Sequence, residues 1–166
     1  MSQTMPTELE FLILPAADLM NRNVVSVSET ESLNDAISTL TKRGIGGVPV
    51  INAAGRPVGV LTQSDVLVHD RTTAGGQQSV PEFYQRADLH AASQDALSGL
   101  SVESIAGVCV RDVMTPVVFS VAPTATAKTV VEELLRLRVH RMFVVDDAGV
   151  LVGVIGTTDL LRRLLD

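Results

Sequence analysis

The chain has 166 residues, 46% hydrophobic and 19% charged, so it can form one large or two small packed domains and is too apolar to be disordered. Its net charge of −6 argues against a nucleic-acid-binding protein, which would normally present a basic surface. Aromatic residues make up only 3%, and the single cysteine, Cys109, cannot form an intrachain disulfide. We therefore expect an aliphatic core and a reducing compartment.

Residues 1–16 form an N-terminal lead-in with one short apolar stretch, "FLILP" at 11–15. No basic region precedes this stretch, so it does not resemble a secretory signal. No apolar run in the sequence approaches the roughly 18 residues of a membrane span. We expect a cytoplasmic protein that does not associate with membranes.

Residues 17–68 form the first predicted structural unit, with the order strand, helix, strand, strand, helix. The first helix is predicted because apolar residues recur at i, i+3, i+4 and i+7, the spacing of one helical face. These residues are Leu33, Ala36, Ile37 and Leu40. Strand-like apolar runs lie at 24–27, 47–52 and 57–61, and the last two are joined by a glycine-containing turn. The final helix is predicted to begin near Ser64.

Residues 69–110 form an insert with a net charge of −3, from five acidic residues and two arginines. Its glycine-rich start at 72–79 predicts a flexible loop, and the remainder could form one irregular helix. The insert is long for a loop, so two interpretations stay open. It is either a plain connector or a segment with a regulatory or partner-contacting role.

Residues 111–166 repeat the first unit at a fixed offset of 94 residues, without a gap. Over 18–67 and 112–161, 15 of the 50 aligned positions are identical, which indicates duplication of one structural unit. The apolar helical face recurs as Ala127, Val130, Val131 and Leu134. Strands are predicted at 117–121, 141–146 and 151–155, and the last helix begins near Thr158. Two copies can pack sheet against sheet about a pseudo-twofold axis.

The stretch "GVLTQSDVL" at 59–67 recurs as "GVIGTTDLL" at 153–161. Gly59 would let another backbone or a flat ring approach closely. Thr62, Ser64 and Asp65 follow where a strand becomes a helix, whose N-terminus offers unpaired N–H groups; an aspartate there can accept hydrogen bonds from a ribose diol. This combination is typical of an adenosine phosphate site. The alternative is plain helix capping, for which such residues before an apolar run are the ordinary pattern.

Residues 17–68 and 111–165 resemble the CBS (cystathionine-β-synthase) domains. The resemblance rests on the openings "DLMNRNVVSV" and "DVMTPVVFSV", on the strands "GVPVIN" and "RMFVVD", and on the glycine–apolar–apolar–hydroxyl–x–x–Asp signature. It implies an α+β fold, a tandem pair in which each repeat has the order β-α-β-β-α. It also implies clefts between the repeats that bind AMP, ADP, ATP or S-adenosylmethionine. The second copy departs from the signature, because Gly156 replaces the hydroxyl residue.

Cations gather at 136–141 of the second copy. Arg136 and Arg138 are expected as surface charges on a helix. His140 and Arg141 begin a strand and are similar to the phosphate-contacting His-Arg pairs in the γ subunits of AMP-activated protein kinases. Because a carboxylate that holds ribose repels the attached phosphates, we expect Arg141, and after it His140, to contact phosphate of a ligand whose ribose sits on Asp65 or Asp159. Alternatively, His140 is a buried, hydrogen-bonded histidine.

Together these considerations predict a set of nucleotide-binding residues. The set is Val24, Thr62, Ser64, Asp65, Val118, His140, Arg141, Thr157, Thr158 and Asp159.

The predicted function is a regulatory module that binds adenine nucleotides and signals to an unidentified partner protein. Alternatives are a ligand-free structural or dimerisation module and an S-adenosylmethionine sensor. No nucleophile–base–acid set and no metal-ligand spacing is evident, so we expect no enzymatic turnover, no metal and no required cofactor. The leucine-rich stretch 159–165 and the frequency of twofold assemblies predict a homodimer.

Overall fold

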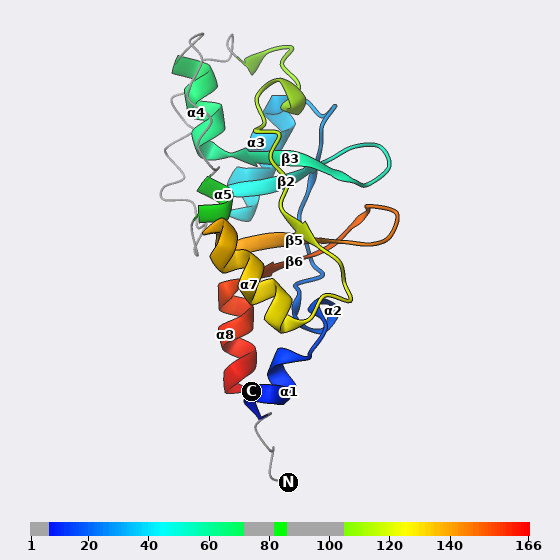
Figure 1. Cartoon of the computed structure of the whole chain (residues 1–166). Coiled ribbons are helices and arrows are strands. Elements are labelled where there is room, and N and C mark those ends of the chain that lie inside the picture. The colour runs from blue at the N-terminus through cyan, green and yellow to red at the C-terminus, as the bar shows by residue number, and fades with distance from the viewer. Residues whose placement is uncertain (1–6, 72–81, 86–104) are drawn as a thin grey trace. The chain divides into compact units, whose positions relative to one another are not determined.

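The computed structural model describes residues 7–71, 82–85 and 105–166 (Figure 1). These residues divide into two compact units. The terminal unit joins the residues up to Val24 to Phe119–Asp166, and the middle unit is Val25–Val118. Each unit contains one three-stranded sheet.

The middle unit contains the sheet β1-β2-β3, in which β1 is parallel and β3 antiparallel to the central strand. The elements of the first repeat are β1 (Val27–Ser28), α3 (Leu33–Arg43), β2 (Gly47–Ile51), β3 (Pro57–Thr62) and α4 (Gln63–Arg71). They appear in the predicted order, so the β-α-β-β-α prediction is confirmed. The described part of the insert adds the short helix α5 (Glu82–Gln85), and the 3₁₀ turn η2 (Val110–Asp112) follows it. The rest of the predicted irregular helix, 86–104, lies outside the described residues.

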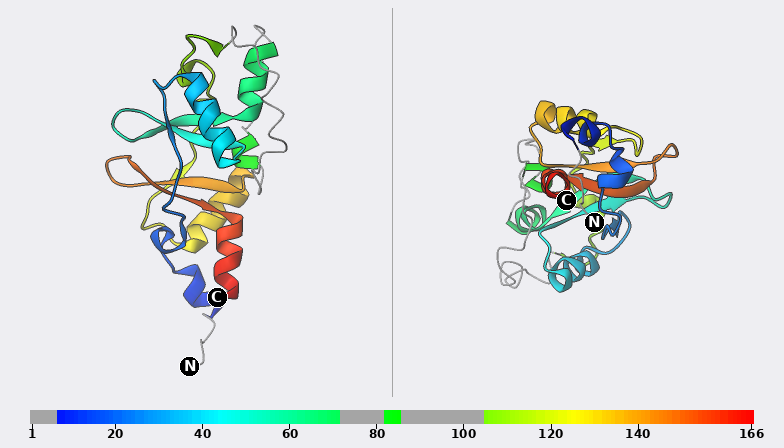
Figure 2. Two further views of the ribbon diagram at one scale, coloured as in Figure 1. Left: turned by 180° about the vertical axis from the view of Figure 1, so that it is seen from behind. Right: turned by 90° about the horizontal axis from the view of Figure 1, so that it is seen from below.

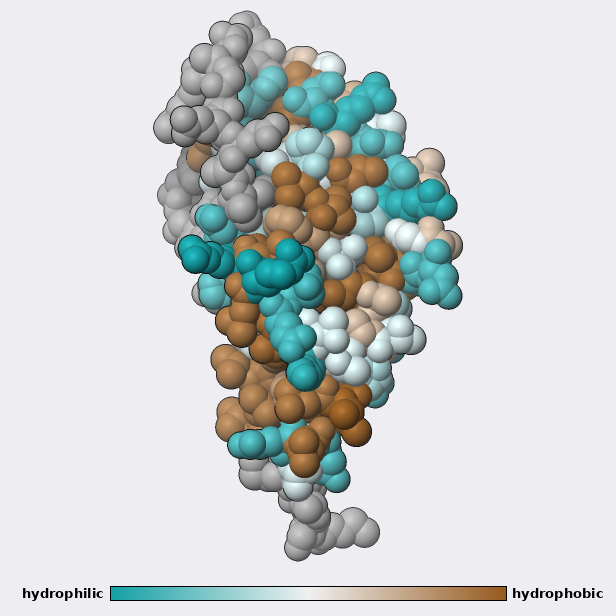
Figure 3. Space-filling model, viewed as in Figure 1, coloured by the Kyte–Doolittle hydropathy of each residue, from teal (hydrophilic) through white to brown (hydrophobic). Residues whose placement is uncertain are grey.

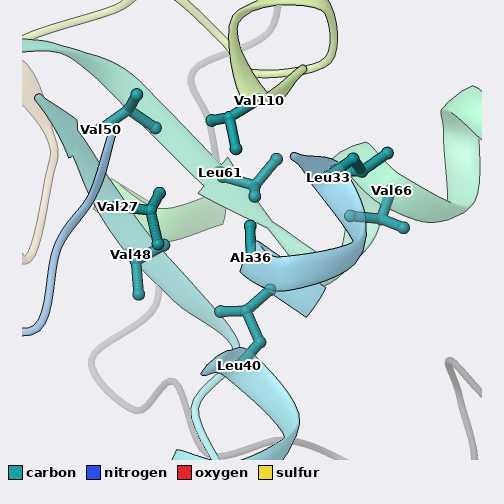
Figure 4. Close-up of a cluster of buried hydrophobic side chains, with 9 residues drawn as sticks. All are labelled: Val27, Leu33, Ala36, Leu40, Val48, Val50, Leu61, Val66 and Val110. Carbon is teal, nitrogen blue, oxygen red and sulfur yellow. The ribbon is translucent and has the colours of Figure 1, made fainter. Parts of the chain in front are cut away.

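The core of the middle unit is aliphatic, as the composition predicts. Leu33, Ala36 and Leu40 of the predicted helical face are fully buried against the sheet. Figure 4 shows the cluster they form with side chains of the strands, α4 and η2. Ile37, the fourth residue of that face, is only partly buried at the edge of the cluster.

The terminal unit repeats this architecture. Its sheet has the order β4-β5-β6, again with one parallel and one antiparallel neighbour. The elements are β4 (Ser120–Val121), α7 (Ala127–Leu137), β5 (Arg141–Val145), β6 (Leu151–Gly156) and α8 (Thr157–Leu165). Two short helices complete the unit: α1 (Glu8–Leu12) in the N-terminal lead-in and α2 (Ala16–Leu19) at the start of the first repeat. Figures 1 and 2 show α1 beside α7 and α8.

The opening segment of each repeat packs on the sheet of the other repeat. Asn21 exchanges two backbone hydrogen bonds with Val154 of β6, at 2.8 and 3.0 Å. Thr115 exchanges the equivalent pair with Val60 of β3, at 2.9 and 3.0 Å. The two compact units are therefore not the two sequence repeats, because each combines the opening of one with the sheet of the other.

This exchange explains the repeated glycine of the signature. A Cβ atom on Gly59 would lie 2.6 Å from the backbone oxygen of Thr115, closer than such atoms can approach. A Cβ atom on Gly153 would lie 2.5 Å from Sδ of Met20 and 3.1 Å from the backbone oxygen of Asn21. In both units the glycine permits the close approach of the opening segment, through its backbone at Gly59 and mainly through the side chain of Met20 at Gly153.

Candidate functional site

The middle site consists of Thr62, Ser64, Asp65 and Val118, the predicted residues that fall in the middle unit. The strand β3 ends at Thr62 and α4 begins at Gln63, which places Asp65 in the first helical turn. The Oδ2 atom of Asp65 accepts hydrogen bonds from the backbone N–H and the hydroxyl of Thr62, at 2.9 and 3.0 Å. The backbone N–H of Asp65 donates to the Thr62 hydroxyl at 3.2 Å. These reciprocal bonds are a capping box, so helix capping is shown for this acid.

A further hydroxyl that the sequence analysis missed reaches the same carboxylate. Thr115 lies 50 residues along the chain and donates from Oγ1 to Oδ1 of Asp65 at 2.9 Å. The close approach at Gly59 brings it there, together with the exposed Val118 that follows. Both oxygens of Asp65 therefore already accept hydrogen bonds from the chain itself. The sequence places Thr115 directly after the repeated Met114, which marks it as part of the opening segment. Only the fold shows that its hydroxyl contacts Asp65.

The terminal site consists of Val24, His140, Arg141, Thr157, Thr158 and Asp159. Here Asp159 caps α8 by accepting the backbone N–H of Gly156 on Oδ2 at 2.9 Å. Gly156 supplies no hydroxyl, and the residue at the position of Thr115 is Asn21, whose Oδ1 accepts the backbone N–H of Asn23 at 3.0 Å. Within the described part of the chain, Oδ1 of Asp159 therefore accepts no hydrogen bond.

Arg141 and Asp159 meet at Gly156. Arg141 is the strand partner of Gly156, and its side chain is half-buried. A Cβ atom on Gly156 would lie 3.7 Å from Cβ of Arg141 and 3.5 Å from Oδ2 of Asp159. The glycine that breaks the signature thus lies between Cβ of Arg141 and the carboxylate of Asp159 at the start of α8, where the helix N-terminus favours an anion.

The remaining predicted residues lie around this point. The backbone N–H of Thr157 donates to the backbone oxygen of His140 at 2.9 Å, and Thr158 is exposed in the first turn of α8. Val24 is half-buried at the end of the opening segment. His140 is exposed, so the alternative of a buried histidine is wrong.

The other two arginines of the cluster are surface residues, as expected. Arg136 donates to Glu133 from Nε at 3.1 Å and from Nη2 at 2.6 Å. This hydrogen-bonded guanidinium lowers the pKa of Glu133, whose ion pair is exposed and adds little to stability. Arg138 ends α7 in the left-handed conformation, with φ of 56°.

An apolar groove between α1, α7 and α8 is a feature that the sequence analysis did not place. It has a volume of about 770 Å³, and His140 and Thr157 lie at its edge. Leu135 and Leu161 line it while remaining 73% and 62% exposed. Figure 3 shows hydrophobic surface over α8 and α1, beside the polar outer face of α7.

Among the residues that the structure describes, no group of three or more His, Cys, Asp or Glu side chains comes together as metal ligands. No helix in these parts of the chain is long and apolar enough to cross a membrane.

Sequence relatives extend over nearly the whole chain. Protein MJ1426 of Methanocaldococcus jannaschii is 28% identical over 160 residues, which are 92% of either protein. The γ subunit of 5'-AMP-activated protein kinase from Saccharomyces cerevisiae is 30% identical over 161 residues. That alignment covers 95% of this chain but only 43% of the yeast subunit.

Solved structures show the same fold. The crystal structure of CBSX2 in complex with AMP is similar with a TM-score of 0.62 and 24% identity, covering 91% of this chain and 96% of that one. CBSX2 is a CBS-pair protein from Arabidopsis thaliana. The CBS domain family itself matches residues 16–71 and 110–166. The chain therefore belongs to the CBS domain family and contains two CBS domains in tandem.

Proposed function

We propose that this CBS pair binds an adenine nucleotide at the terminal site and transmits its presence to a partner protein. The observation that carries the proposal is the meeting of Arg141 and Asp159 at Gly156. An acid and an arginine that flank one glycine at a helix N-terminus fit a ribose attached to a phosphate.

Each group has a distinct part in this binding. Oδ1 of Asp159 accepts a ribose hydroxyl, while Oδ2 stays engaged with the backbone N–H of Gly156. The Arg141 guanidinium offsets the phosphate charge, which the carboxylate would otherwise repel. Thr157 and Thr158 begin a nine-residue helix whose positive dipole end adds to the attraction.

The relatives support the ligand class. CBSX2 is 27% identical over 144 residues and was crystallised with AMP. The γ subunits of 5'-AMP-activated protein kinases from yeast and from mammals also align with this chain. From the same relatives we infer a regulatory role without enzymatic turnover.

A thermal-shift series with AMP, ADP, ATP, S-adenosylmethionine and adenosine tests the ligand class. A ligand that binds only the folded protein stabilises it, by about 2.7 kcal/mol at 100 times its dissociation constant. We expect the phosphorylated nucleotides to raise the melting temperature more than adenosine does. A shift with S-adenosylmethionine alone would indicate the sensor alternative. No shift with any of the five would indicate a ligand-free structural module.

We also propose that the chain is a homodimer through the groove between α1, α7 and α8. Leu135, Leu161 and Leu164, which line this groove, are exposed. The charged residues Lys128, Glu132 and Arg136 lie on the outer face of α7. A self-complementary apolar face of this kind fits a twofold interface between two copies.

A further inference from the structure

Within the described residues, the insert contributes a cover to the middle site. Its helix α5 packs against β3 of the middle unit. Phe83 and Tyr84 are 2% and 0% exposed, and their rings meet edge to face with centroids 5.3 Å apart. Two buried aromatic side chains are notable in a protein with only 3% aromatic residues.

Phe83 lies over the strand pair that leads into the middle site. A Cβ atom on Gly47 would be 3.1 Å from Cδ2 of Phe83 and 3.2 Å from Cγ2 of Thr62. Gly47 pairs with Thr62 as Arg141 pairs with Gly156 in the terminal unit. The phenyl ring therefore lies beside the position from which, in the terminal site, the arginine side chain extends.

Tyr84 reaches the other end of the middle site. Its hydroxyl donates to the backbone oxygen of Val117 at 2.7 Å. Val117 adjoins Val118 and lies two residues beyond Thr115, whose hydroxyl holds Asp65. The two rings of α5 thus lie at both ends of the middle site, Phe83 near Thr62 and Tyr84 at Val117.

A tyrosine in this position has the shape and polarity of a nucleobase. It presents a flat apolar ring and one hydrogen-bond donor at its edge, directed at a backbone oxygen. Adenine likewise presents a flat ring with an amino donor at its edge. A group tethered within the same chain also acts at an effective concentration of about millimolar, above that of a ligand at micromolar concentration.

Building on the proposed function, we infer that Phe83 and Tyr84 of the insert occupy the middle site, with Tyr84 in place of the base and Phe83 beside the position that corresponds to Arg141. A nucleotide enters this site only when α5 leaves it. The chain therefore takes one nucleotide per protomer at micromolar concentration, at the terminal site. By occupying the middle site, α5 of the insert sets the number of nucleotides bound per chain.

Calorimetric titration of AMP into the wild type and into Phe83→Ala/Tyr84→Ala tests the inference. We expect one equivalent per chain for the wild type and two for the double variant. Tyr84→Phe is the matched control, because it removes only the hydroxyl that donates to Val117 and keeps both rings; it should stay at one equivalent. Two equivalents in the wild type, or one in a folded double variant, would overturn the inference and leave the proposed function standing.

A second measurement needs no variant. The protein has one tyrosine and no tryptophan, so 3-fluorotyrosine labelling gives a single ¹⁹F signal, from Tyr84. We expect a solvent-shielded signal that stays unchanged while micromolar AMP fills the terminal site and becomes exposed at millimolar AMP. An exposed signal in the nucleotide-free protein would contradict the inference even if the double variant does not fold.

The outcomes also separate this inference from the proposed function. If the wild type binds no AMP and the double variant binds one equivalent, α5 blocks the middle site and the terminal-site assignment is wrong. If neither protein binds AMP, ADP or ATP, the proposed function fails and the inference fails with it.

Discussion

Asp65 and Asp159 occupy the same position in the two repeats, yet they have different hydrogen-bond partners. Asp65 accepts hydrogen bonds from Thr62 and from Thr115 on both of its oxygens. Asp159 accepts one from Gly156, and among the described residues its second oxygen accepts none. The first acid is held by its own chain, and the second has an oxygen to offer a ligand.

Replacing each acid by alanine should separate these roles. Asp65→Ala removes a cap and the partner of two hydroxyls, so we expect a loss of about 2–3 kcal/mol in the free energy of unfolding. Asp159→Ala removes one cap bond and should cost about 1 kcal/mol. Urea denaturation of both variants measures the difference. Equal losses would mean that the contact between Thr115 and Asp65 adds nothing to stability.

The sequence predicts that Asp65 and Asp159 lie at helix starts, because this placement follows from local patterns. It does not predict that Thr115 meets Asp65, because that contact spans 50 residues and depends on the exchange of opening segments. Nor does it show that Asn21 is turned toward its own backbone at Asn23.

The helices α3 and α7 are predicted from the periodicity of their apolar residues. Both begin after a capping hydroxyl, Ser32 or Thr126, and both bury the predicted apolar face. The short helices α1 and α2 are not predicted by the sequence, because four or five residues carry too little periodicity, whereas α5 falls within the irregular helix predicted for the insert. Their formation depends on packing with segments far away in the sequence.

The two helices end in the same conformation with different residues. Gly44 ends α3 with φ of 62°, and Arg138 ends α7 with φ of 56°. Glycine adopts this left-handed region freely, whereas other residues pay about 1–2 kcal/mol. A Cβ atom on Gly44 would meet nothing within 4 Å, so a substitution there changes the backbone preference alone.

We therefore expect Arg138→Gly to stabilise the protein by about 0.5–1 kcal/mol, after the greater freedom of glycine in the unfolded chain is subtracted. Gly44→Ala should destabilise it by about 1 kcal/mol. Arg138→Ala is the control for loss of the arginine side chain. A fall in stability with Arg138→Gly, relative to Arg138→Ala, would show that the left-handed conformation costs nothing here.

For the whole molecule, the duplication and the α+β architecture could be predicted from the sequence because the two copies align without a gap. The division into a terminal and a middle unit could not, since it arises from backbone pairing at Val60 and Val154. The same pairing places residues of both repeats in each candidate site. Neither repeat alone therefore contains a complete site.

The proposed homodimer predicts the mass of the protein in solution. The chain mass is 17.6 kDa, and light scattering at micromolar concentration should give twice that value. Leu161→Glu places a charge in the apolar groove and should yield the single-chain mass, because burying an unpaired charge opposes association. Lys128→Glu, on the exposed outer face of α7, should leave the dimer intact. A wild type that scatters only as 17.6 kDa would contradict the dimer.

We propose that the terminal site binds the phosphate of an adenine nucleotide through Arg141. Calorimetric titration of AMP and of adenosine into the wild type and into Arg141→Ala tests this contact directly. We expect the variant to lose at least tenfold in affinity for AMP, since a charge-assisted hydrogen bond contributes about 1.5–3 kcal/mol, and to change little for adenosine. An equal loss for both ligands would mean that Arg141 shapes the fold and does not contact phosphate.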